Sequence, residues 1–308
     1  MELRTLRYFV ALAQEGSFSA AAKSTHVTQP TLSRQLAALE DELHQQLYLR
    51  KHSGVQLTRE GTILLGYAQE IVALADKAVE EVAPTAATIT GKVHIAAGET
   101  QIMGLVARAM ALCKERYPGV HFLLYSGTTA SLHDGFSKGQ YDIMIECEAR
   151  PHVEYNTYEL PFKDVWGVLM RRDNMLARQR GISPDDLRGQ KIMYSQQAEK
   201  AGVIKKWAGQ AYADYEISCA WTLPLNSKYL VREGLGLTLT YAGLFDDDGH
   251  DLCFRPLTPL MESTQAIVWR KAPLSRQAQA FLGILLNLCE DEEGIKAMMD
   301  NALYSNFD

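Results

Sequence analysis

The sequence has few cysteines and lacks long apolar runs. No stretch of eighteen or more apolar residues occurs in the 308-residue chain, so we expect no membrane-spanning helix and no membrane partner. The first residues, Met1-Glu2-Leu3-Arg4, do not form the apolar core of a signal peptide, which predicts a cytoplasmic protein. The five cysteines are odd in number and lie far apart, as in reduced proteins. A redox switch between two of them is the alternative, although isolated buried thiols explain the pattern more simply.

Enzyme motifs are also scarce. We find no His-Glu-x-x-His, no Ser-x-x-Lys and no phosphate-binding loop. The pair Gly234 and Gly236 lacks the third glycine of a dinucleotide-binding fingerprint, and the eight histidines show no metal-ligand spacing. We therefore predict no catalytic residue, no metal and no cofactor, so the chain is not expected to be an enzyme. The loop Asp246-Asp247-Asp248-Gly249 could bind a cation, but a solvated turn is the simpler interpretation.

The negative charge of the chain lies outside its first sixty residues. The whole chain has a formal net charge of −6. Residues 1–60 contain seven Lys and Arg against six Asp and Glu, a net of +1, so the remainder has 24 against 31, a net of −7. One weakly basic segment binds DNA poorly, whereas two copies on a palindrome roughly double the phosphate contacts. A DNA-binding function for residues 1–60 would therefore require a dimer.

Two short helices around a tight turn are predicted over residues 17–43. Thr28 is a good N-cap, and Pro30 fits a first helical turn. The second helix has one apolar stripe with a helical period, formed by Leu32, Leu36, Leu39 and Leu43. Its opposite face is small, hydroxylic and singly basic, so it can approach a DNA groove. An ordinary amphipathic helix with a solvated face is the alternative that this pattern alone leaves open.

A helix-turn-helix places the first residues of its second helix against base edges. Gln29 suits adenine and Arg34 suits guanine, while hydroxyl groups suit phosphates. Residues 47–58 then predict a two-stranded wing with a basic tip beside the phosphate backbone, although a basic turn is more often simply solvated. The candidate DNA-binding residues are Ser19, Thr28, Gln29, Pro30, Thr31, Ser33 and Arg34 in the helices, and Arg50, Lys51, His52 and Ser53 in the wing.

The first sixty residues resemble the winged helix-turn-helix of the LysR-type transcriptional regulators. The matching stretches are residues 6–11, 39–43 and 57–61, together with Gly16-Ser17-Phe18-Ser19-Ala20-Ala21-Ala22 and Val27-Thr28-Gln29-Pro30-Thr31-Leu32-Ser33-Arg34-Gln35-Leu36. The resemblance implies a DNA-binding domain over residues 1–58, a linker helix, and a two-lobed effector domain similar to periplasmic solute-binding proteins. It also implies homodimers that pair into homotetramers, double-stranded promoter DNA as a partner, and RNA polymerase as a further one.

A continuous helix is predicted from residue 59 to about residue 82. Thr58 is a plausible N-cap and Pro84 closes the helix. One apolar row repeats at spacings of four and three residues, as in a coiled-coil seam, and consists of Leu64, Ala68, Ile71, Ala75, Ala78 and Val82. We therefore expect residues 59–90 to form a linker helix and hinge through which two copies pair. A helix that packs only on its own domain is the alternative.

Strands and helices alternate from residue 91 onward. This order predicts an α/β fold with a mainly parallel sheet and crossover helices, in two similar lobes. By the resemblance, residues 91–308 form the effector-binding domain, and the chain crosses between lobes near residues 161–163 and 264–266. Lobe I would then comprise residues 91–161 and 266–308, and lobe II residues 162–265.

Three polar turns follow predicted strands, where ligands of open α/β sheets bind beside helix N-termini. The candidate effector-binding residues in these turns are Thr100, Gln101, Thr128, Thr129, Ser195 and Gln196. Helix capping alone is the alternative for each. By the resemblance, Thr100 and Thr128 occupy positions where effector contacts are common. Hydroxyls, amides and helix N-termini favour a small polar or anionic effector, while Glu99 and Glu146 near the mouth oppose a highly charged anion.

Together these patterns predict a sequence-specific DNA-binding transcriptional regulator that a small molecule controls. Closure of the two lobes around this effector would change the spacing of the paired DNA-binding domains. A free solute-binding protein is the rival interpretation of the second half, and it would require export.

Overall fold

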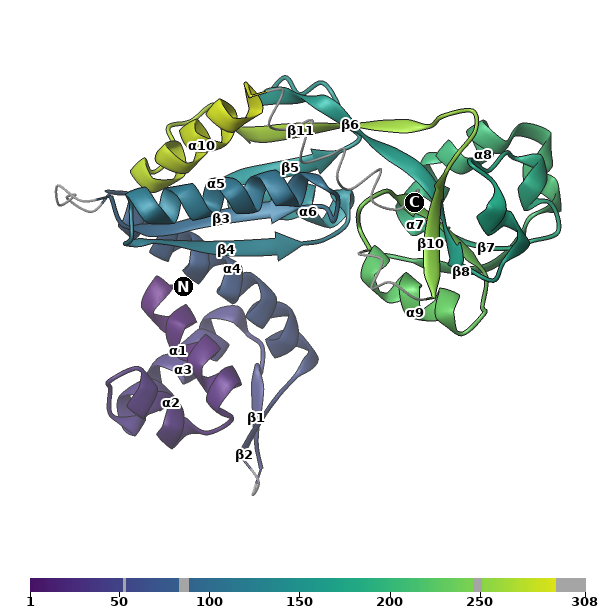
Figure 1. Ribbon diagram of the computed structural model, residues 1–308. Coiled ribbons are helices and arrows are strands. Elements are labelled where there is room, and N and C mark those ends of the chain that lie inside the picture. The colour runs from purple at the N-terminus through teal and green to yellow at the C-terminus, as the bar shows by residue number, and fades with distance from the viewer. Residues whose placement is uncertain (52–53, 83–88, 246–250, 292–308) are drawn as a thin grey trace. The chain divides into compact units, whose positions relative to one another are not determined.

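The computed structural model describes residues 1–51, 54–82, 89–245 and 251–291 (Figure 1). The chain divides into two compact units, Met1–Pro84 and Thr85–Asp308. His52 and Ser53 of the predicted wing tip, and the acidic loop of Asp246, Asp247 and Asp248, lie outside the described residues. Among the helices that are described, none combines the length and the apolar character that crossing a membrane requires.

The second and third helices of the first unit begin at residues whose side chains cap them. Ser17 caps the second helix, where its hydroxyl accepts a hydrogen bond from the N–H of Ala20 at 3.2 Å. Thr28 caps the third helix by accepting from the N–H of Thr31 at 3.4 Å, and Pro30 occupies its first turn. The elements are α1 (Leu3–Glu15), α2 (Phe18–Ser24), α3 (Gln29–Leu43), the antiparallel strands β1 (Tyr48–Lys51) and β2 (Gly54–Leu57), and α4 (Arg59–Val82).

The predicted leucine stripe of α3 is buried over most of its length. Leu32 and Leu36 are fully buried and Leu39 is 1% exposed, all against Phe9 of α1 and its neighbours in the core. The fourth member, Leu43, is 36% exposed, because it lies in the last turn of the helix, beyond the core. The stripe therefore holds α3 on the unit while its opposite face stays accessible.

Helix α4 packs on its own unit through one apolar row and leaves another apolar row exposed. Ala68 is fully buried, and Leu64, Leu65 and Val72 pack against the same core. Part of the predicted pairing seam, Leu64 and Ala68, therefore belongs to the core of this unit. The exposed row consists of Ile63, Tyr67, Ile71 and Leu74. We call these four residues the outer row of α4.

The start of α4 comes very close to the chain that precedes the wing. A Cβ atom on Gly61 would lie 1.9 Å from the carbonyl oxygen of Leu47, so only glycine allows this approach. Further along, Asp76 of α4 forms an ion pair with Arg7 of α1. These contacts attach α4 to α1 and to the segment before β1.

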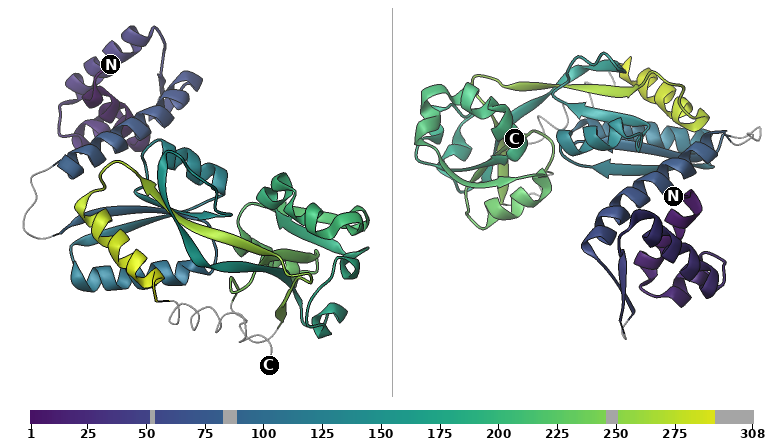
Figure 2. Two further views of the ribbon diagram at one scale, coloured as in Figure 1. Left: turned by 90° about the horizontal axis from the view of Figure 1, so that it is seen from above. Right: turned by 180° about the vertical axis from the view of Figure 1, so that it is seen from behind.

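The second unit consists of two α/β lobes joined by two long strands, which Figure 2 shows from above. In lobe I, β3 pairs in parallel with β4 and β5, and β11 pairs antiparallel with β5. In lobe II, β7 pairs in parallel with β8 and β9. The bounds are β3 (Gly91–Ala97), α5 (Ile102–Arg116), β4 (Val120–Ser126), α6 (Thr129–Ser137), β5 (Ile143–Cys147), β6 (Tyr155–Arg171), β7 (Lys191–Ser195), α7 (Gln196–Ala201), α8 (Val203–Ala208), β8 (Glu216–Trp221), α9 (Ser227–Arg232), β9 (Leu237–Tyr241), β10 (Leu252–Pro256), β11 (Glu262–Arg270) and α10 (Arg276–Cys289).

Strand β6 runs through both lobes. Its first part pairs antiparallel with β11 as far as Val165, and its second part, from Trp166, pairs antiparallel with β9 and β10. Strand β11 has an irregular register between Thr264 and Ala266. The predicted crossing points fall on these two strands, although the sheet contains more antiparallel pairing than the expected parallel order.

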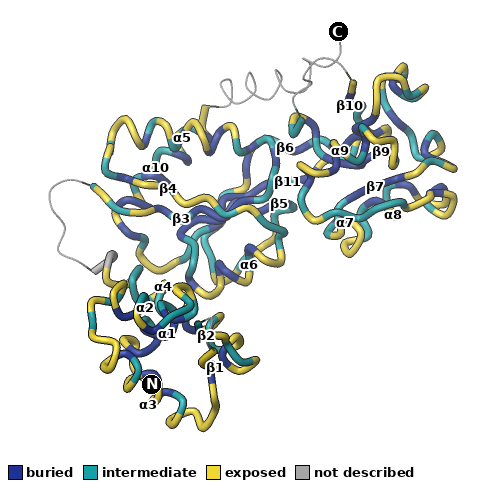
Figure 3. Tube along the Cα trace, turned by 90° about the horizontal axis from the view of Figure 1, so that it is seen from below, coloured by how far each residue is buried: buried dark blue, intermediate teal, exposed yellow. Residues whose placement is uncertain are grey.

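Lobe I has helices on both faces of its sheet. Ile95, Ile143 and other alternating residues face α5 and α10, whereas Ala96, Met144 and their counterparts face α6. Because successive side chains of a strand point to opposite faces, Glu146 of β5 is expected on the side of α6. Figure 3 shows how completely these central strands are buried.

Two features of lobe II do not follow from the alternation of strands and helices in the sequence. Residues 196–214 form α7, α8 and a 3-10 turn (Gly209–Asp214) and not one continuous helix, because Gly202 with φ of 67° ends α7 in the left-handed conformation. Strand β10 was not predicted, because its sequence, Leu-Cys-Phe-Arg-Pro, is short and follows the acidic loop. Neither feature changes the expected fold class.

Candidate nucleic-acid interface and effector cleft

The first turn of α3 presents the polar surface that the sequence predicts. Thr28, Gln29, Pro30, Thr31 and Arg34 are all exposed. The hydroxyls of Thr28 and Thr31 lie 2.8 Å apart. This surface is small and has one cation, so nothing on it prevents close approach to a groove.

Helix α2 and the wing hold polar residues of α3 in place. The hydroxyl of Ser19 on α2 donates to the side-chain oxygen of Gln29 at 3.0 Å, and both residues are exposed. From β1, the guanidinium of Arg50 lies 4.2 Å from the ring centroid of Phe18 and donates to the hydroxyl of Ser33 at 2.7 Å. Arg50 thus connects the wing to α3. Sequence reasoning did not indicate this connection, because Phe18, Ser33 and Arg50 are distant in the chain.

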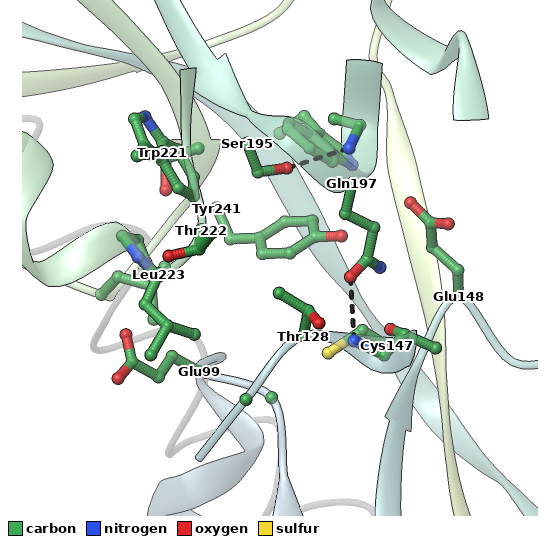
Figure 4. Close-up of a pocket in the computed structure, with 18 residues that line it drawn as sticks. Glu99, Thr128, Cys147, Glu148, Ser195, Gln197, Trp221, Thr222, Leu223 and Tyr241 are labelled. Atoms are coloured by element: carbon green, nitrogen blue, oxygen red, sulfur yellow. Dashed lines mark hydrogen bonds between the residues drawn. The ribbon is translucent and has the colours of Figure 1, made fainter. Parts of the chain in front are cut away.

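A narrow cleft lies between the lobes of the second unit (Figure 4). It receives Thr128 and Cys147 from lobe I, and Ser195, Trp221 and Tyr241 from lobe II. About 60 Å³ of it is open to water-sized molecules, so this conformation accepts only a small ligand. A roomier cavity of about 440 Å³ adjoins it, and the two share the lining residues Glu99, Pro224 and Leu244.

The predicted effector residues are divided between the two cavities. Thr128, Thr129 and Ser195 line the narrow cleft, and Thr100 and Gln101 line the adjoining cavity. Gln196 is exposed and lines neither, whereas its neighbour Gln197 lines the cleft. Thr128 and Ser195 also cap α6 and α7, accepting from Ser131 and Ala198 respectively. Capping and lining thus coexist at both positions.

Aromatic side chains form the wall that sequence reasoning missed. Trp166 and Tyr241 pack with ring centroids 4.5 Å apart, and both donate to the hydroxyl of Ser263, at 2.8 and 3.2 Å. Trp221 donates to the hydroxyl of Thr238 at 2.9 Å. The signal that could have found Trp221 and Tyr241 was their position at the carboxyl ends of predicted strands.

A hydrogen bond between described residues crosses the cleft. The N–H of Thr129, at the start of α6 in lobe I, donates to the side-chain oxygen of Gln197 in lobe II at 3.1 Å (Figure 4). This bond occupies a helix N-terminal donor that an anionic ligand would use. It also holds the two lobes together in the described conformation.

A buried carboxyl group lies behind the cleft where β6 passes between lobes. Burial raises the pKa of Asp164 to about 7, against weaker opposing effects of the Thr100 hydroxyl and the Gln101 N–H. The side chain of Gln265 on β11 donates to Asp164 at 2.5 Å. The Thr100 hydroxyl lies near this carboxyl group but lacks the geometry of a full hydrogen bond. Asp164 therefore connects the two crossing strands with the adjoining cavity.

Two acidic residues line the narrow cleft, Glu99 and Glu148, while its described lining contains no Lys, Arg or His. Burial raises the pKa of Glu148, against the charge of Arg150. Glu146, expected near the mouth, is instead 2% exposed, because it faces α6. There its carboxylate contacts two histidines that no sequence spacing brings together, His133 and His152.

The cysteines are free, and four of the five are buried. Cys147 lines the cleft, where burial and the nearby charges of Asp164 and Glu148 raise the pKa of its thiol. A raised thiol pKa makes a poor nucleophile at neutral pH, which opposes a redox role for Cys147. One Gly-x-Ser-x-Gly pattern occurs at residues 135–139, but Ser137 ends α6 and donates to the backbone of Asp134, so it does not form a strand-to-helix nucleophile turn.

Comparison with known protein families assigns both units. Residues 3–62 match the bacterial regulatory helix-turn-helix protein of the lysR family, and residues 86–290 match the LysR substrate binding domain. The chain belongs to the LysR family of transcriptional regulators. It is a DNA-binding regulator and not an enzyme, and the resemblance inferred from the sequence is confirmed.

Relatives match along nearly the whole chain. The uncharacterized HTH-type transcriptional regulator YbhD of Escherichia coli (strain K12) is 26% identical over 301 residues, covering 95% of this chain and 93% of that protein. The Hca operon transcriptional activator HcaR of the same organism is 26% identical over 293 residues, covering 92% and 97%. The crystal structure of CbnR, a LysR family transcriptional regulator, has a TM-score of 0.72 at 21% identity, over 94% of this chain and all of that chain. At this identity the structural match shows the fold.

Proposed function

We propose that two copies of this LysR-type regulator bind one palindromic operator, and that they bind it differently when a small molecule enters the cleft. The observation that carries this proposal is the amphipathic character of α3. Leu32 and Leu36 are fully buried, whereas Gln29 and Arg34 are exposed on its opposite face. Gln29 and Arg34 would read base edges, and the hydroxyls of Ser19, Thr28, Thr31 and Ser33 with Arg50 and Lys51 of the wing would contact phosphates. Such a regulator acts in the cytoplasm, where promoters and RNA polymerase are accessible.

Pairing would use the outer row of α4. Ile63, Tyr67 and Leu74 are 48–61% exposed and Ile71 is 40% exposed, which is unusual for large apolar side chains on one helix. A second copy would cover this row, and the linker helix of residues 59–90 would serve as the dimerisation element. Pairs of such dimers would then form the homotetramer.

The effector is a small polar molecule without net negative charge. Glu99 and Glu148 oppose an anion in the cleft, and the N–H of Thr129 is already occupied by Gln197. Hydroxyls from Thr128 and Ser195 would bind polar groups, and the rings of Trp221 and Tyr241 would cover an apolar part. Because these groups come from both lobes, a bound ligand favours the closed lobes and shifts the population toward them.

The decisive experiment measures DNA binding and the ligand response in the full chain. Fluorescence anisotropy with DNA from the promoter region beside the coding frame should show binding that weakens steeply with salt. A panel of neutral, cationic and anionic metabolites is then screened by thermal shift. Failure to bind any of these DNA fragments at low salt would contradict the proposed operator recognition.

Matched variants test the cleft. Thr128→Asn keeps a side-chain oxygen that caps α6 but changes the group that faces the ligand. We expect Thr128→Asn and Thr128→Ala both to lose the ligand response while they keep DNA affinity. A full response in both variants would remove Thr128 from the effector site.

A matched pair of variants tests the dimer. Leu74→Glu in the outer row should shift light scattering toward the monomer, because it places a charge in the proposed interface. Leu260→Glu serves as the control, since Leu260 is similarly exposed, at 59%, and lies in the second unit. An unchanged oligomeric state in Leu74→Glu would exclude the outer row as the interface.

A further inference from the structure

A cluster of three metal-ligating side chains lies in lobe I, outside the residues that line the two cavities. His133 is on α6, Glu146 is on β5, and His152 is in the segment between β5 and β6. The Nε2 atom of His133 is 2.7 Å from one oxygen of Glu146, and the Nε2 atom of His152 is 2.7 Å from the other. All three potential ligand atoms lie within 4.8 Å of one another. The cluster therefore already converges on one point.

Burial of the cluster is uneven. The side chain of Glu146 is fully buried, whereas the side chains of His133 and His152 are 30% and 14% exposed. A buried carboxylate is costly unless charged or hydrogen-bonding groups surround it. Here the partners are two imidazoles that reach solvent on their other side. An ion can enter from that side and reach the oxygens of the buried carboxyl group.

The donor set is that of a zinc site with three protein ligands. Two imidazole nitrogens and one carboxylate oxygen, with a fourth position left for water, form a recurrent tetrahedral arrangement for Zn²⁺. Zn–N and Zn–O distances of about 2.0–2.2 Å place the ligand atoms of such a site roughly 3.3 Å apart. The contacts of 2.7 Å would lengthen and the widest separation would shorten. Rotations of the two partly exposed imidazoles can supply both changes, while the buried carboxylate stays fixed.

From this geometry we propose that His133, Glu146 and His152 bind one Zn²⁺ ion. Imidazole ligands suit zinc, copper and nickel, while a set of two imidazoles and one carboxylate is typical of zinc. The ion replaces the two hydrogen bonds with metal–ligand bonds, and the protons on the two Nε2 atoms move to Nδ1 or to solvent. No spacing in the sequence shows this site, because its ligands come from three separate elements.

The ion would join elements that also form the lobe I wall of the cleft. His133 lies one turn after Thr129 on α6, and Glu146 directly precedes Cys147, while Thr129 and Cys147 line the cleft. Helix α6 rests on β5 in the fold (Figure 3). A bound ion therefore fixes α6 relative to β5 and the segment that follows β5.

The test uses the full-length chain without a histidine tag, after chelator treatment and dialysis. Titration calorimetry with Zn²⁺ should give one equivalent bound per chain. Co²⁺ should give visible d–d bands of tetrahedral intensity without the near-ultraviolet bands of thiolate ligation. Wild-type protein that binds no Zn²⁺, or Co²⁺ spectra with thiolate bands, would overturn the proposal, since the five free cysteines are the competing ligands.

Variants separate the three ligands from the rest of the chain. His133→Gln and His152→Gln should each weaken Zn²⁺ affinity by roughly 10-fold or more, because loss even of outer-shell partners costs about 10–100-fold. His121→Gln is the control, since His121 is an exposed histidine of β4 in the same lobe. Equal weakening in the control and in the ligand variants would also overturn the proposal. Glu146→Gln is added if its metal-free melting curve shows that it folds; the two histidine variants decide the outcome without it.

Discussion

The surface of α3 and the cleft of the second unit differ in how their polar groups are assembled. On α3, the groups proposed to contact DNA lie within a few residues of one another and are exposed because the leucine stripe faces the core. The cleft gathers its groups from at least five strand ends and helix starts across both lobes, and much of its lining is buried. A local surface depends on the helix beneath it, whereas an assembled cleft depends on the strands that join the lobes.

The largest expected effect tests the dependence of the α3 surface on its core. Leu36→Ala removes a fully buried side chain and should destabilise the first unit by about 2–5 kcal/mol. DNA binding should fall with the loss of folded unit, as measured by denaturant unfolding and anisotropy on one sample. Leu49→Ala is the comparison, because Leu49 of β1 is 40% exposed. If both variants lost stability and DNA binding to a similar extent, the buried leucines of α3 would not be what holds its DNA-facing surface in place.

The matching test for the cleft uses Asp164. Because burial raises its pKa to about 7 from an ordinary value of 3.8, the folded chain binds a proton more tightly than the unfolded chain does. The contribution of Asp164 to the free energy of unfolding is therefore fully present below about pH 4, and it is lost as the pH rises from about 4 to about 7. Asp164→Asn removes that loss and should stabilise the protein at pH 8 by up to about 4 kcal/mol, at roughly 1.4 kcal/mol for each pKa unit.

The control for Asp164 is Glu159→Gln, which changes an exposed carboxyl group on the same strand. Urea unfolding at pH 5 and pH 8 measures both variants. We expect the stabilisation by Asp164→Asn to be much smaller at pH 5 than at pH 8. A variant no more stable than wild type at pH 8 would show that burial does not raise the pKa of Asp164.

A smaller effect distinguishes base reading from phosphate contact on α3. Arg34→Ala should weaken binding to the cognate operator by about 1–3 kcal/mol if its guanidinium reads a base. Binding to random DNA of the same length should change much less. Equal weakening on both DNAs would make Arg34 a phosphate contact, and then Gln29 would be the remaining candidate for base readout.

The sequence predicts the local surface of α3 better than it predicts the assembled cleft. The N-cap of Thr28, the Pro30 turn and the leucine stripe through Leu39 are local patterns, so helix propensity and period predict them. The exposure of Leu43 and the burial of Ala68 were not predicted, because both depend on where the core of the folded unit ends. Similarly, period 2 predicts that Glu146 and Cys147 face opposite sides of β5, but only the folded lobe shows which side meets His133.

In the second unit, Thr128 and Ser195 could be found because each caps a helix after a strand, a pattern confined to a few residues. Gln197 and Trp166 could not, since their roles arise from the approach of lobe II to lobe I. The antiparallel pairing of β6 with β11 also joins residues about a hundred positions apart, and no local pattern encodes it. Sequence patterns therefore identify local groups that line the cleft more readily than groups that come together only when the two lobes meet.

The smallest expected effect concerns the bond that crosses the cleft. Gln197→Ala removes the acceptor of the Thr129 N–H and should cost about 0.5–1.5 kcal/mol of the closed conformation, the usual net value of one hydrogen bond. Small-angle scattering should show a slightly larger radius of gyration without ligand, while the proposed effector should restore the wild-type value by bridging the lobes. Gln196→Ala is the matched control, because its exposed side chain lines neither cavity. If both variants scatter like wild type, the lobes are held by the strands β6 and β11 alone, and the cleft would be as rigid as the surface of α3.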